Sequence, residues 1–497
     1  MPAWHAELAW LPDRLGGLRE RVLIEVAGER IARLTPDLEP PPRAARLPGL
    51  VIPGLANAHS HVFQRALRGH TEMGAPSPGS AGYSPGSAVE SGGSFWTWRE
   101  QMYSLAAVID PDSLHQLARA VYGEMTLAGV TAVGEFHYLH HQPDGTPYEN
   151  PNRMGEELVA AADEAGVRIT VLDTCYLQGG LDGRPLEGAQ RRFGDGSAAA
   201  WAMRAAGLRG GPRVRIGAAV HSVRAVDERS IEQVAAWAAE RKLPLHVHVS
   251  EQPQENEDCL RATGLTPTGL LARAGALGPN TTAVHATHLR PTDIQALGES
   301  RTTICLCPIT ERALADGVGP AAALVAAGSP LSLGSDSHAA IDLFEEARAV
   351  ELDQRLVTGR RGHHTPEALL RAATAGGMAA LGWDGAELAP GALADFIALD
   401  VGSVRLAGWT RESLLAHVVH AATSSDVTDV VVDGRTVVSG RRHQALGDVP
   451  ALLRDAIGRA RAPAHHPAAG GRETPRLGEE ASGKVLSPRR ELRLRRD

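Results

Sequence analysis

The chain has little cysteine, no long apolar run and no concentration of positive charge before its last residues. Among its 497 residues are four cysteines, Cys175, Cys259, Cys305 and Cys307, which are too scattered for a disulfide scaffold and are expected to be reduced. No stretch of about 18 apolar residues is present, and the charged N-terminal segment is unlike a signal peptide. The 50 basic and 58 acidic residues give a net charge of −8, which argues against nucleic-acid binding. We therefore expect a cytoplasmic protein with neither a membrane nor a nucleic-acid partner.

Length and composition indicate a large domain with a smaller one beside it. Hydrophobic residues make up 43% of the chain and charged residues 22%, as in ordinary globular proteins. Single cores stop growing near about 250–300 residues, so one core does not account for the whole chain. Two segments are expected to be irregular: a Gly/Ser/Pro-rich loop at 74–93 and a disordered tail at 463–497, which ends in arginines.

Both ends of the chain are rich in strand-forming residues. Short apolar runs at 22–26 and 30–34 are joined by a turn, and Asp433-Gly434 lies between two valine-rich runs, which is a strong hairpin signal. We interpret residues 1–50 and 386–450 as one small β-sandwich domain, built from both ends of the chain around a central insertion.

The centre of the chain, residues 51–385, alternates apolar strands with alanine-rich helical stretches, which is typical of a parallel α/β fold. Eight strand candidates can be counted: Leu50–Leu55, Val130–Phe136, Arg168–Asp173, Val214–Val220, Leu245–Val249, Thr282–Ala286, Thr303–Cys307 and Pro330–Gly334. Eight strands with helical crossovers predict a (β/α)8 TIM-like barrel.

The strongest local motif is a pair of histidines, His59 and His61, directly after the first strand candidate. On an extended backbone, residues i and i+2 point to the same side, so both imidazoles can reach one ion. An H-x-H motif alone is weak evidence. Its position matters more, because the active sites of such barrels lie at the carboxyl ends of the strands.

Further metal-binding residue types follow other strands. His248 and Glu251 are at the end of the fifth strand, His285 is at the end of the sixth, and Asp336 follows the eighth. Histidine and aspartate that converge from several strand ends on one rim predict a metal-dependent active site.

At these motifs the sequence resembles the amidohydrolase superfamily and, within it, the formimidoylglutamate deiminase family. The resemblance extends over residues 20–440. It is carried by Asn57–Gly69, Ser94–Tyr103, Glu135–His141, His221–Val226, His248–Gln254, Val284–His288 and Gly334–His338. The resemblance implies one zinc ion per subunit, with iron or manganese as alternatives, held by His59, His61, His248 and Asp336. It also implies a homodimer.

Strand four supports a single metal ion. Two-metal members of the superfamily use a carboxylated lysine from this strand, but Val214–Val220 contains no lysine and is followed by His221. Three imidazoles and a carboxylate leave room for a water molecule, whose pKa zinc lowers toward about 7. His246, two residues before His248, is left out of the ligand set, following the superfamily pattern.

The resemblance also implies a reaction, the hydrolysis of N-formimidoyl-L-glutamate to N-formyl-L-glutamate and ammonia. Asp336 and His285 are the two candidates to take a proton from the attacking water, and the sequence does not choose between them. Glu251 is placed to hold the imino nitrogen and to protonate the departing ammonia.

The expected substrate carries two carboxylates, and a planar guanidinium group is a natural partner for each. Arg99 and Arg224 match the positions that the family uses for this purpose, and Gln64, Tyr138 and His221 match further substrate contacts.

Two other functions are compatible with the metal motif. Other deaminases of the superfamily act on guanine, adenosine-like compounds or triazines, but a purine has no pair of carboxylates for Arg99 and Arg224 to bind. A non-catalytic metal-binding protein would not need the proton-transfer residues Glu251 and His285. Formimidoylglutamate hydrolysis is therefore the preferred hypothesis.

Overall fold

Eight parallel strands form the centre of the structure, a computed structural model that describes residues 1–71 and 93–461. In hydrogen-bonded order they are β5 (Leu55–Ser60), β6 (Val130–His137), β7 (Arg168–Cys175), β8 (Val214–Val220), β9 (Leu245–Val249), β10 (Thr281–His285), β11 (Thr303–Leu306) and β12 (Leu331–Leu333). Backbone bonds between Asp336 and the two histidines of the first strand, of 3.0 and 3.2 Å, bring the last strand end back to the first. The barrel predicted from the sequence is confirmed.

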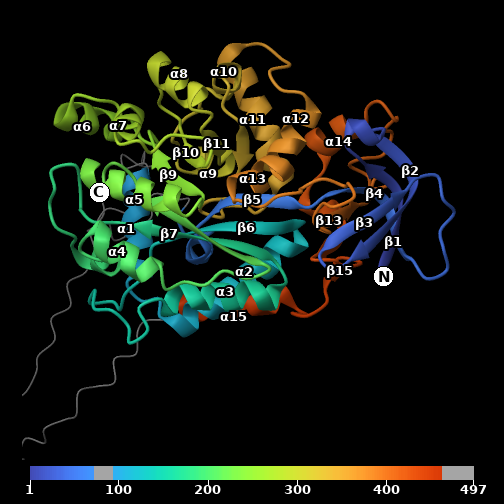
Figure 1. The fold of residues 1–497 in the computed structure, drawn as a ribbon, viewed down its shortest axis with the longest axis horizontal. Helices are drawn as coiled ribbons and strands as arrows, with labels where there is room; N and C mark the ends of the chain where they lie inside the picture. The colour runs from blue at the N-terminus through green and yellow to red at the C-terminus, as the bar shows by residue number, and fades with distance from the viewer. Residues whose placement is uncertain (72–92, 462–497) are drawn as a thin grey trace, which may run out of the picture. The chain divides into compact units, whose positions relative to one another are not determined.

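Helices connect the successive barrel strands, further helices follow the last of these strands, and together they surround the barrel, as Figure 1 shows. They are α1 (Phe95–Ala106), α2 (Pro111–Leu127), α3 (Arg153–Ala165), α4 (Ala198–Ala205), α5 (Glu228–Glu240), α6 (Pro253–Thr263), α7 (Pro267–Arg273), α8 (Pro291–Glu299), α9 (Pro308–Ala313), α10 (Ala321–Ala327), α11 (Leu343–Thr358), α12 (Pro366–Arg371), α13 (Gly377–Ala380), α14 (Leu414–Ala421) and α15 (Val449–Arg461). Short helical turns are η1 (Asp13–Leu15), η2 (Val62–Leu67), η3 (Gly188–Phe193), η4 (Ala372–Gly376) and η5 (Ser424–Asp426).

Helix α2 illustrates how the local sequence sets these elements. Asp110 caps its first turn by accepting a 2.8 Å hydrogen bond from Ser113 N, and Pro111 occupies the first helical position, where no N–H donor is needed. Leu114, Leu117 and Val121 recur at helical spacing and are buried in the main core. One face of α2 therefore packs inward, and its N-terminus is fixed by the cap.

The two ends of the chain form a second sheet, with the order β16-β15-β14-β13-β4-β1-β2-β3. Its strands are β1 (Ala3–Trp10), β2 (Leu18–Ala27), β3 (Arg30–Thr35), β4 (Ala45–Pro53), β13 (Phe396–Leu399), β14 (Val427–Val432), β15 (Arg435–Ser439) and β16 (Arg442–His443). In Figure 1 the blue N-terminal strands lie beside the orange and red β13 and β15. A bridge between Arg30 and Leu393 joins the start of the edge strand β3 to the segment before β13, so the sheet curls around its own core.

One strand differs from the expectation. Leu50–Leu55 was expected to be the first barrel strand, but residues up to Pro53 continue β4 in the terminal sheet, and the barrel begins with β5 at Leu55. The chain crosses between the sheets at Gly54, where a Cβ atom would lie 2.2 Å from Thr131 Oγ1. The apolar run is continuous across this crossing because both strands are buried, so hydrophobicity alone could not locate the boundary.

A buried ion pair joins the barrel to the terminal sheet. Arg168 of β7 donates to both oxygens of Asp395, at 2.6 and 3.2 Å, and Asp395 also accepts a 2.7 Å bond from Asp433 N. The four cysteines are buried and unpaired, as expected. Within the described residues, no helix combines the length and apolarity needed to cross a membrane. The Gly/Ser/Pro-rich segment expected at 74–93, apart from its last residue, and the tail expected at 463–497 lie outside these residues.

Candidate active site

The H-x-H motif lies at the carboxyl end of β5. His59 is within the strand and His61 directly follows it, and both side chains are buried, with ring centroids 4.7 Å apart. The alternation of an extended backbone turns both imidazoles to the same side, as the sequence predicts.

His248 and Asp336 meet this pair from the far strands. His248 Nε2 lies 3.1 Å from His59 Nε2 and 3.4 Å from His61 Nε2. Asp336 Oδ1 lies 3.2 Å from His59 Nε2 and 3.4 Å from His61 Nε2. The four side chains expected to bind metal therefore direct one atom each toward a common point, although they come from β5, β9 and the segment after β12.

Two of the three imidazoles, those of His61 and His248, are held in the form that binds a cation. His61 Nδ1 donates to Phe136 O at 3.0 Å and His248 Nδ1 donates to His221 O at 2.9 Å. Because a carbonyl oxygen only accepts, the proton of each neutral ring is on Nδ1, and each Nε2 presents a lone pair. Burial lowers the pKa of His61 to about 3 and that of His248 well below its usual value, so neither Nε2 is protonated.

Two lone pairs that face each other at 3.4 Å repel unless a cation lies between them. Metal–nitrogen bonds of about 2.0–2.1 Å in a tetrahedral site place neighbouring ligand atoms about 3.3 Å apart, which agrees with the distances in this cluster. The donor set of three imidazoles and one carboxylate thus fits a divalent metal ion.

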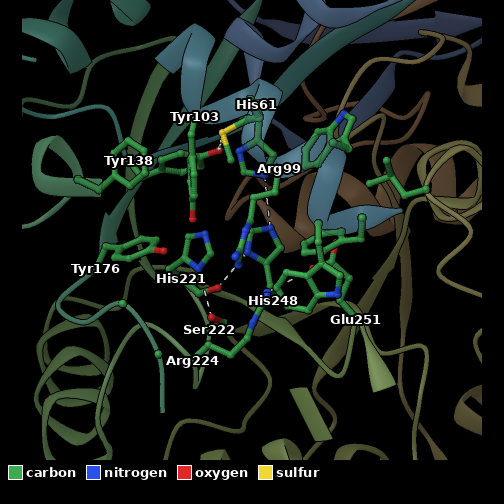
Figure 2. Close-up of a pocket in the computed structure, with 18 of the residues that line it drawn as sticks. His61, Arg99, Tyr103, Tyr138, Tyr176, His221, Ser222, Arg224, His248 and Glu251 are labelled. Carbon is green, nitrogen blue, oxygen red and sulfur yellow. Dashed lines mark hydrogen bonds and ion pairs between the residues drawn. The ribbon is translucent and has the colours of Figure 1, made fainter. Parts of the chain in front are cut away.

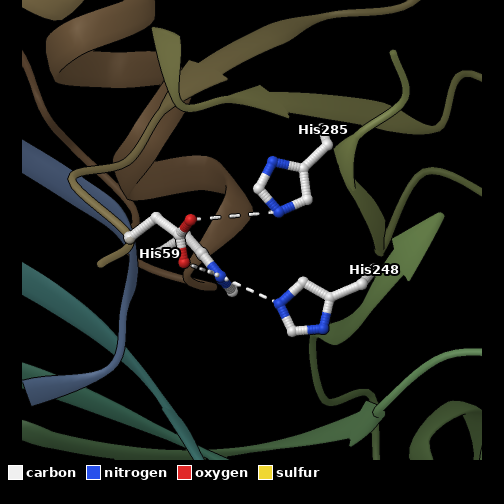
Figure 3. Close-up of side chains that lie close together, drawn as sticks. His59, His248 and His285 are labelled. Carbon is white, nitrogen blue, oxygen red and sulfur yellow. Dashed lines mark hydrogen bonds and ion pairs between the residues drawn. The ribbon is translucent and has the colours of Figure 1, made fainter. Parts of the chain in front are cut away.

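His285, at the end of β10, borders the same cluster. His59, His248, His285 and Asp336 offer ligand atoms that all lie within 4.8 Å of one another, and Figure 3 shows the three imidazoles directed toward a common centre. His285 Nε2 is 4.0 Å from Asp336 Oδ2 and 3.6 Å from Glu251 Oε1. These distances are longer than those within the predicted ligand set, so His285 lies beside it.

The carboxylates around His285 decide its charge. Burial disfavours the imidazolium, but Glu251, Asp336 and Glu311 together raise the pKa of His285 well above its usual value. Glu311 Oε1 lies 3.4 Å from His285 Nδ1 and also accepts a hydrogen bond from Cys307 N. With its ring held by Glu311, His285 turns Nε2 toward the expected reaction centre.

The described strand β8 contains no lysine, in agreement with the sequence, and it leads to His221. The pKa of His221 is lowered well below its usual value by burial and by the charge of Arg224. His246, on β9, donates from Nε2 to Ala380 O at 2.9 Å and so is engaged away from the ligand cluster. Leaving His246 out of the ligand set agrees with this contact.

A single pocket contains all the side chains expected to bind substrate. It is lined by Gln64, Arg99, Tyr138, His221 and Arg224, together with His61, His248, Glu251, His285 and Asp336. Figure 2 shows His221, Arg99 and Arg224 directed into the same space, close to His248. Three of the four expected metal ligands, His61, His248 and Asp336, therefore face the same cavity as the expected substrate contacts.

The two arginines differ in their surroundings. Arg99, on α1, lies over the rings of Trp96 and Tyr103 at 4.4 and 5.5 Å, and its buried Nε has no hydrogen-bond partner among the residues that the structure describes. Arg224 Nη2 is 3.4 Å from Glu251 Oε2, and its Nε is 3.8 Å from Glu255 Oε2. Neither guanidinium is saturated, so each can accept a carboxylate ligand.

Gln64 and Tyr138 form a neutral polar contact in the same cavity. Gln64 Nε2 donates to Tyr138 OH at 3.0 Å, and within the described part of the chain the buried Gln64 Oε1 has no partner. Burial raises the pKa of Tyr138 well above its usual value, so the phenol stays neutral. This pair offers an acceptor and a donor to a polar substrate.

The structure adds pocket residues that the sequence analysis missed. Gln190 Nε2 lies 3.2 Å from Tyr103 OH and 3.1 Å from Tyr176 OH, and both phenols line the cavity. Tyr103 is one helical turn after Arg99, and Tyr176 directly follows β7, so helix spacing and strand-end position could have indicated them. Gln190 is on the short turn η3 and carried no such signal.

Comparisons with known proteins agree with this site. The profile of the Amidohydrolase family matches residues 50–437. The chain is similar to a formimidoylglutamate deiminase from Pseudomonas aeruginosa, with 37% identity over 459 residues that cover 89% of this chain and 96% of that protein. An 8-oxoguanine deaminase from the same organism is 30% identical over 399 residues, covering 78% of this chain and 83% of that protein.

Among solved structures, an amidohydrolase from Brucella melitensis matches with a TM-score of 0.83 and 33% identity, covering 93% of this chain and 100% of that one. The superfamily expected from the strand-end motifs is thereby confirmed. The chain belongs to the amidohydrolase family.

Proposed function

We propose that the protein hydrolyses N-formimidoyl-L-glutamate to N-formyl-L-glutamate and ammonia, with one zinc ion at the cluster of His59, His61, His248 and Asp336. The observation that carries the proposal is the cluster of metal-binding side chains whose lone pairs face one another, at a pocket that also contains two arginines. Among the described residues, the Nε atoms of these arginines have no hydrogen-bond partner. The similarity to formimidoylglutamate deiminase supports the same substrate.

Zinc is preferred because imidazole nitrogens and a carboxylate oxygen are ligands that it commonly takes and because it can add a water molecule to such a set, whereas iron and manganese are the alternatives to exclude. When bound, the ion supplies a Lewis acid that makes water acidic enough to attack near neutral pH. The backbone carbonyls that hold Nδ1 of His61 and His248 fix both rings with Nε2 directed toward the cluster, where the ion would bind.

Asp336 and His285 form the path for the proton of the attacking water. Asp336 Oδ1 faces the histidines, whereas Oδ2 faces His285 Nε2 at 4.0 Å. One carboxylate can therefore serve the ion with one oxygen and exchange a proton through the other. We keep both residues in this role; because the neighbouring carboxylates raise the pKa of His285, its ring has to pass on its own proton before it can take that of the water.

Glu251 is proposed to serve the leaving nitrogen. Its Oε1 lies 3.6 Å from His285 Nε2 and its Oε2 lies 3.4 Å from Arg224 Nη2, so it stands between the proton path and the substrate clamp. A carboxylate here favours the protonated amidine, which is the better electrophile. As the oxygen–carbon bond forms and the carbon–nitrogen bond breaks, both hydrogens of the water are transferred to the departing nitrogen. Because the protonated amidine nitrogen already carries two hydrogens, it leaves as ammonium, the protonated form of the product ammonia.

The two carboxylates of the substrate are assigned to Arg99 and Arg224, with Gln64, Tyr138 and His221 as further contacts. The contact with the Trp96 ring, 4.4 Å from Arg99 Cζ, restricts the orientation of the planar guanidinium, which suits a bidentate contact. A purine or triazine has no carboxylate to occupy these two groups.

The test is a steady-state assay of ammonia release by the purified protein, with formimidoylglutamate, guanine, an adenosine and a triazine as separate substrates. Metal content is measured on the same preparation. We expect turnover of formimidoylglutamate alone and one zinc ion per chain. Turnover of a ring substrate instead would assign the chain to another deaminase, and a metal-loaded protein inactive on all four would refute the proposal.

A further inference from the structure

The barrel is joined least strongly where its first and last strands meet, which is also where the proposed metal ligands lie. Strands β5 and β12 are the two ends of the strand order, and an isolated bridge between Ser60 and Asp336 links their ends. His59 and His61 flank Ser60, so the separation of the two strand ends sets the distance between the histidines and Asp336.

A chain of buried side-chain hydrogen bonds spans this junction. It runs from Asn57 through Ser335, His338 and Ser60 to Glu135, and each of these side chains is at most 2% exposed. The successive distances are 2.7, 2.9, 3.1 and 2.7 Å. Three segments of the barrel rim are thereby linked: β5, the neighbouring strand β6, and the segment after β12.

The backbone amide of Ser335 fixes the direction of the bonds from the Asn57 end of this chain. Ser335 N donates to Asn57 Oδ1 at 2.9 Å, so the amide nitrogen of Asn57 faces Ser335 Oγ and donates to it. The hydroxyl of Ser335 is then free to donate to His338 Nδ1.

At the other end, Val62 N donates to Glu135 Oε1 at 2.7 Å, and Glu135 Oε2 accepts from the hydroxyl of Ser60. Ser60 Oγ therefore accepts the Nε2 proton of His338. The two directions agree at His338, which is the neutral Nε2–H tautomer, and every donor in the chain has an acceptor.

The backbone of the segment after β12 needs such support. Asp336 and His338 have φ values of 45° and 60°, in the left-handed region that side chains other than glycine rarely adopt. A strained conformation persists where its surroundings determine it from several sides. His338 is held at both ring nitrogens, and its carbonyl accepts a 2.6 Å bond from Arg68 Nε.

We propose that Ser60, Glu135 and His338 are positioning residues for the metal centre: their directed hydrogen-bond chain joins the first and last strand ends and holds the two histidines of β5 at binding distance from Asp336. This inference rests on the metal site of the proposed function, and it adds a determinant of metal affinity that touches neither metal nor substrate.

Two variants break the chain in different ways. Ser60→Ala removes its central hydroxyl. Glu135→Gln keeps an acceptor for Val62 N but presents N–H groups to Ser60, which would force Ser60 and His338 to reverse their bonds. That reversal would leave the hydroxyl of Ser335 without an acceptor, because Asn57 is fixed by a backbone amide. Both variants should therefore weaken the same hydrogen-bond chain between the first and last strand ends.

The matched control is Ser332→Ala. Ser332 is a buried serine on β12 whose hydroxyl donates to Ile304 O at 3.4 Å, outside the chain. All variants are checked for folding by circular dichroism. The readouts are Zn²⁺ affinity, by competition with a chromogenic chelator, and the visible spectrum of the Co²⁺-loaded protein, which responds to coordination geometry.

We expect Ser60→Ala and Glu135→Gln each to lower Zn²⁺ affinity about 10- to 100-fold and to change the Co²⁺ spectrum. The double variant should lose no more than either single variant, since both break one unit, whereas Ser332→Ala should bind as the wild type does. If one of the two variants does not fold, the other carries the comparison.

Wild-type affinity in the folded variants, or losses that simply add in the double variant, would overturn the positioning chain while leaving the proposed function intact. A wild-type protein that takes up no metal would overturn both.

Discussion

Arg224→Met tests the substrate clamp directly. The Arg224 side chain is 16% exposed and lies 5.7 Å from the Phe95 ring, so methionine can fill the same space without the charge. Its contact with Glu251, at 3.4 Å, is long for a hydrogen bond, so a substrate carboxylate can displace it at little cost. A charged hydrogen bond contributes about 1.5–3 kcal/mol, which corresponds to a loss of about 10- to 150-fold in kcat/KM.

The loss should appear mainly in KM, because a carboxylate remote from the reacting carbon is held equally in the ground state and the transition state. Ammonia release gives kcat and KM, and inhibition by glutarate reports dicarboxylate binding without chemistry. Arg224→Lys, which keeps the charge but not the planar fork, should fall between wild type and Arg224→Met. The control is Arg184→Met, at the same pocket but with a side chain 60% exposed and paired with Asp182, and it should change little. An unchanged KM in Arg224→Met would refute the clamp.

Three further predictions follow from buried charges. Asp336→Asn should lower turnover at least about 1000-fold and reduce the bound metal, because it removes both a ligand charge and a proton acceptor; an active variant would contradict the assignment. The unfolding temperature should fall as pH drops from about 6.5 toward about 4. Burial lowers the pKa of His140 to about 4, so in this range the unfolded chain binds a proton at His140 that the folded chain excludes. His140→Gln should reduce the pH dependence of the unfolding temperature, and an unchanged pH dependence in this variant would contradict the role of His140. Arg168→Met should lower the free energy of unfolding, measured in urea, by about 3–5 kcal/mol, because it leaves Asp395 buried without its partner. The values of kcat and KM should stay unchanged. An unshifted unfolding midpoint would show that the ion pair does not stabilise the fold.

Much of the fold was readable because the barrel repeats a local pattern. Strand candidates such as Val214–Val220 and Leu245–Val249 agree with β8 and β9 residue for residue, since short runs rich in valine, isoleucine and leucine are typical of the strands of a parallel sheet. The same property hid the boundary at Gly54, where two buried strands of different sheets follow each other directly. Hydropathy reports burial, and it does not report which sheet a strand joins.

The site was predictable to the extent that strand ends share one rim. His59, His61, His248 and Asp336 were selected by position and residue type together with family resemblance, and the structure brings their ligand atoms within 3.4 Å of their neighbours. What these side chains touch could not be read in the same way. The contact of Glu251 with Arg224 joins two roles that the sequence analysis assigned separately.

By itself, the sequence determined the eight-strand periodicity, the β-rich ends and the residue types at the carboxyl ends of the strands, because these depend on local spacing and on the rule that parallel strands end at one rim. Only the tertiary structure decided the tautomers of His61 and His248 and the contact between Glu311 and His285. It also decided the hydrogen-bond chain through Ser60 and His338. Each of these depends on partners dozens to hundreds of residues away, and an ångström in their distance decides whether a bond exists.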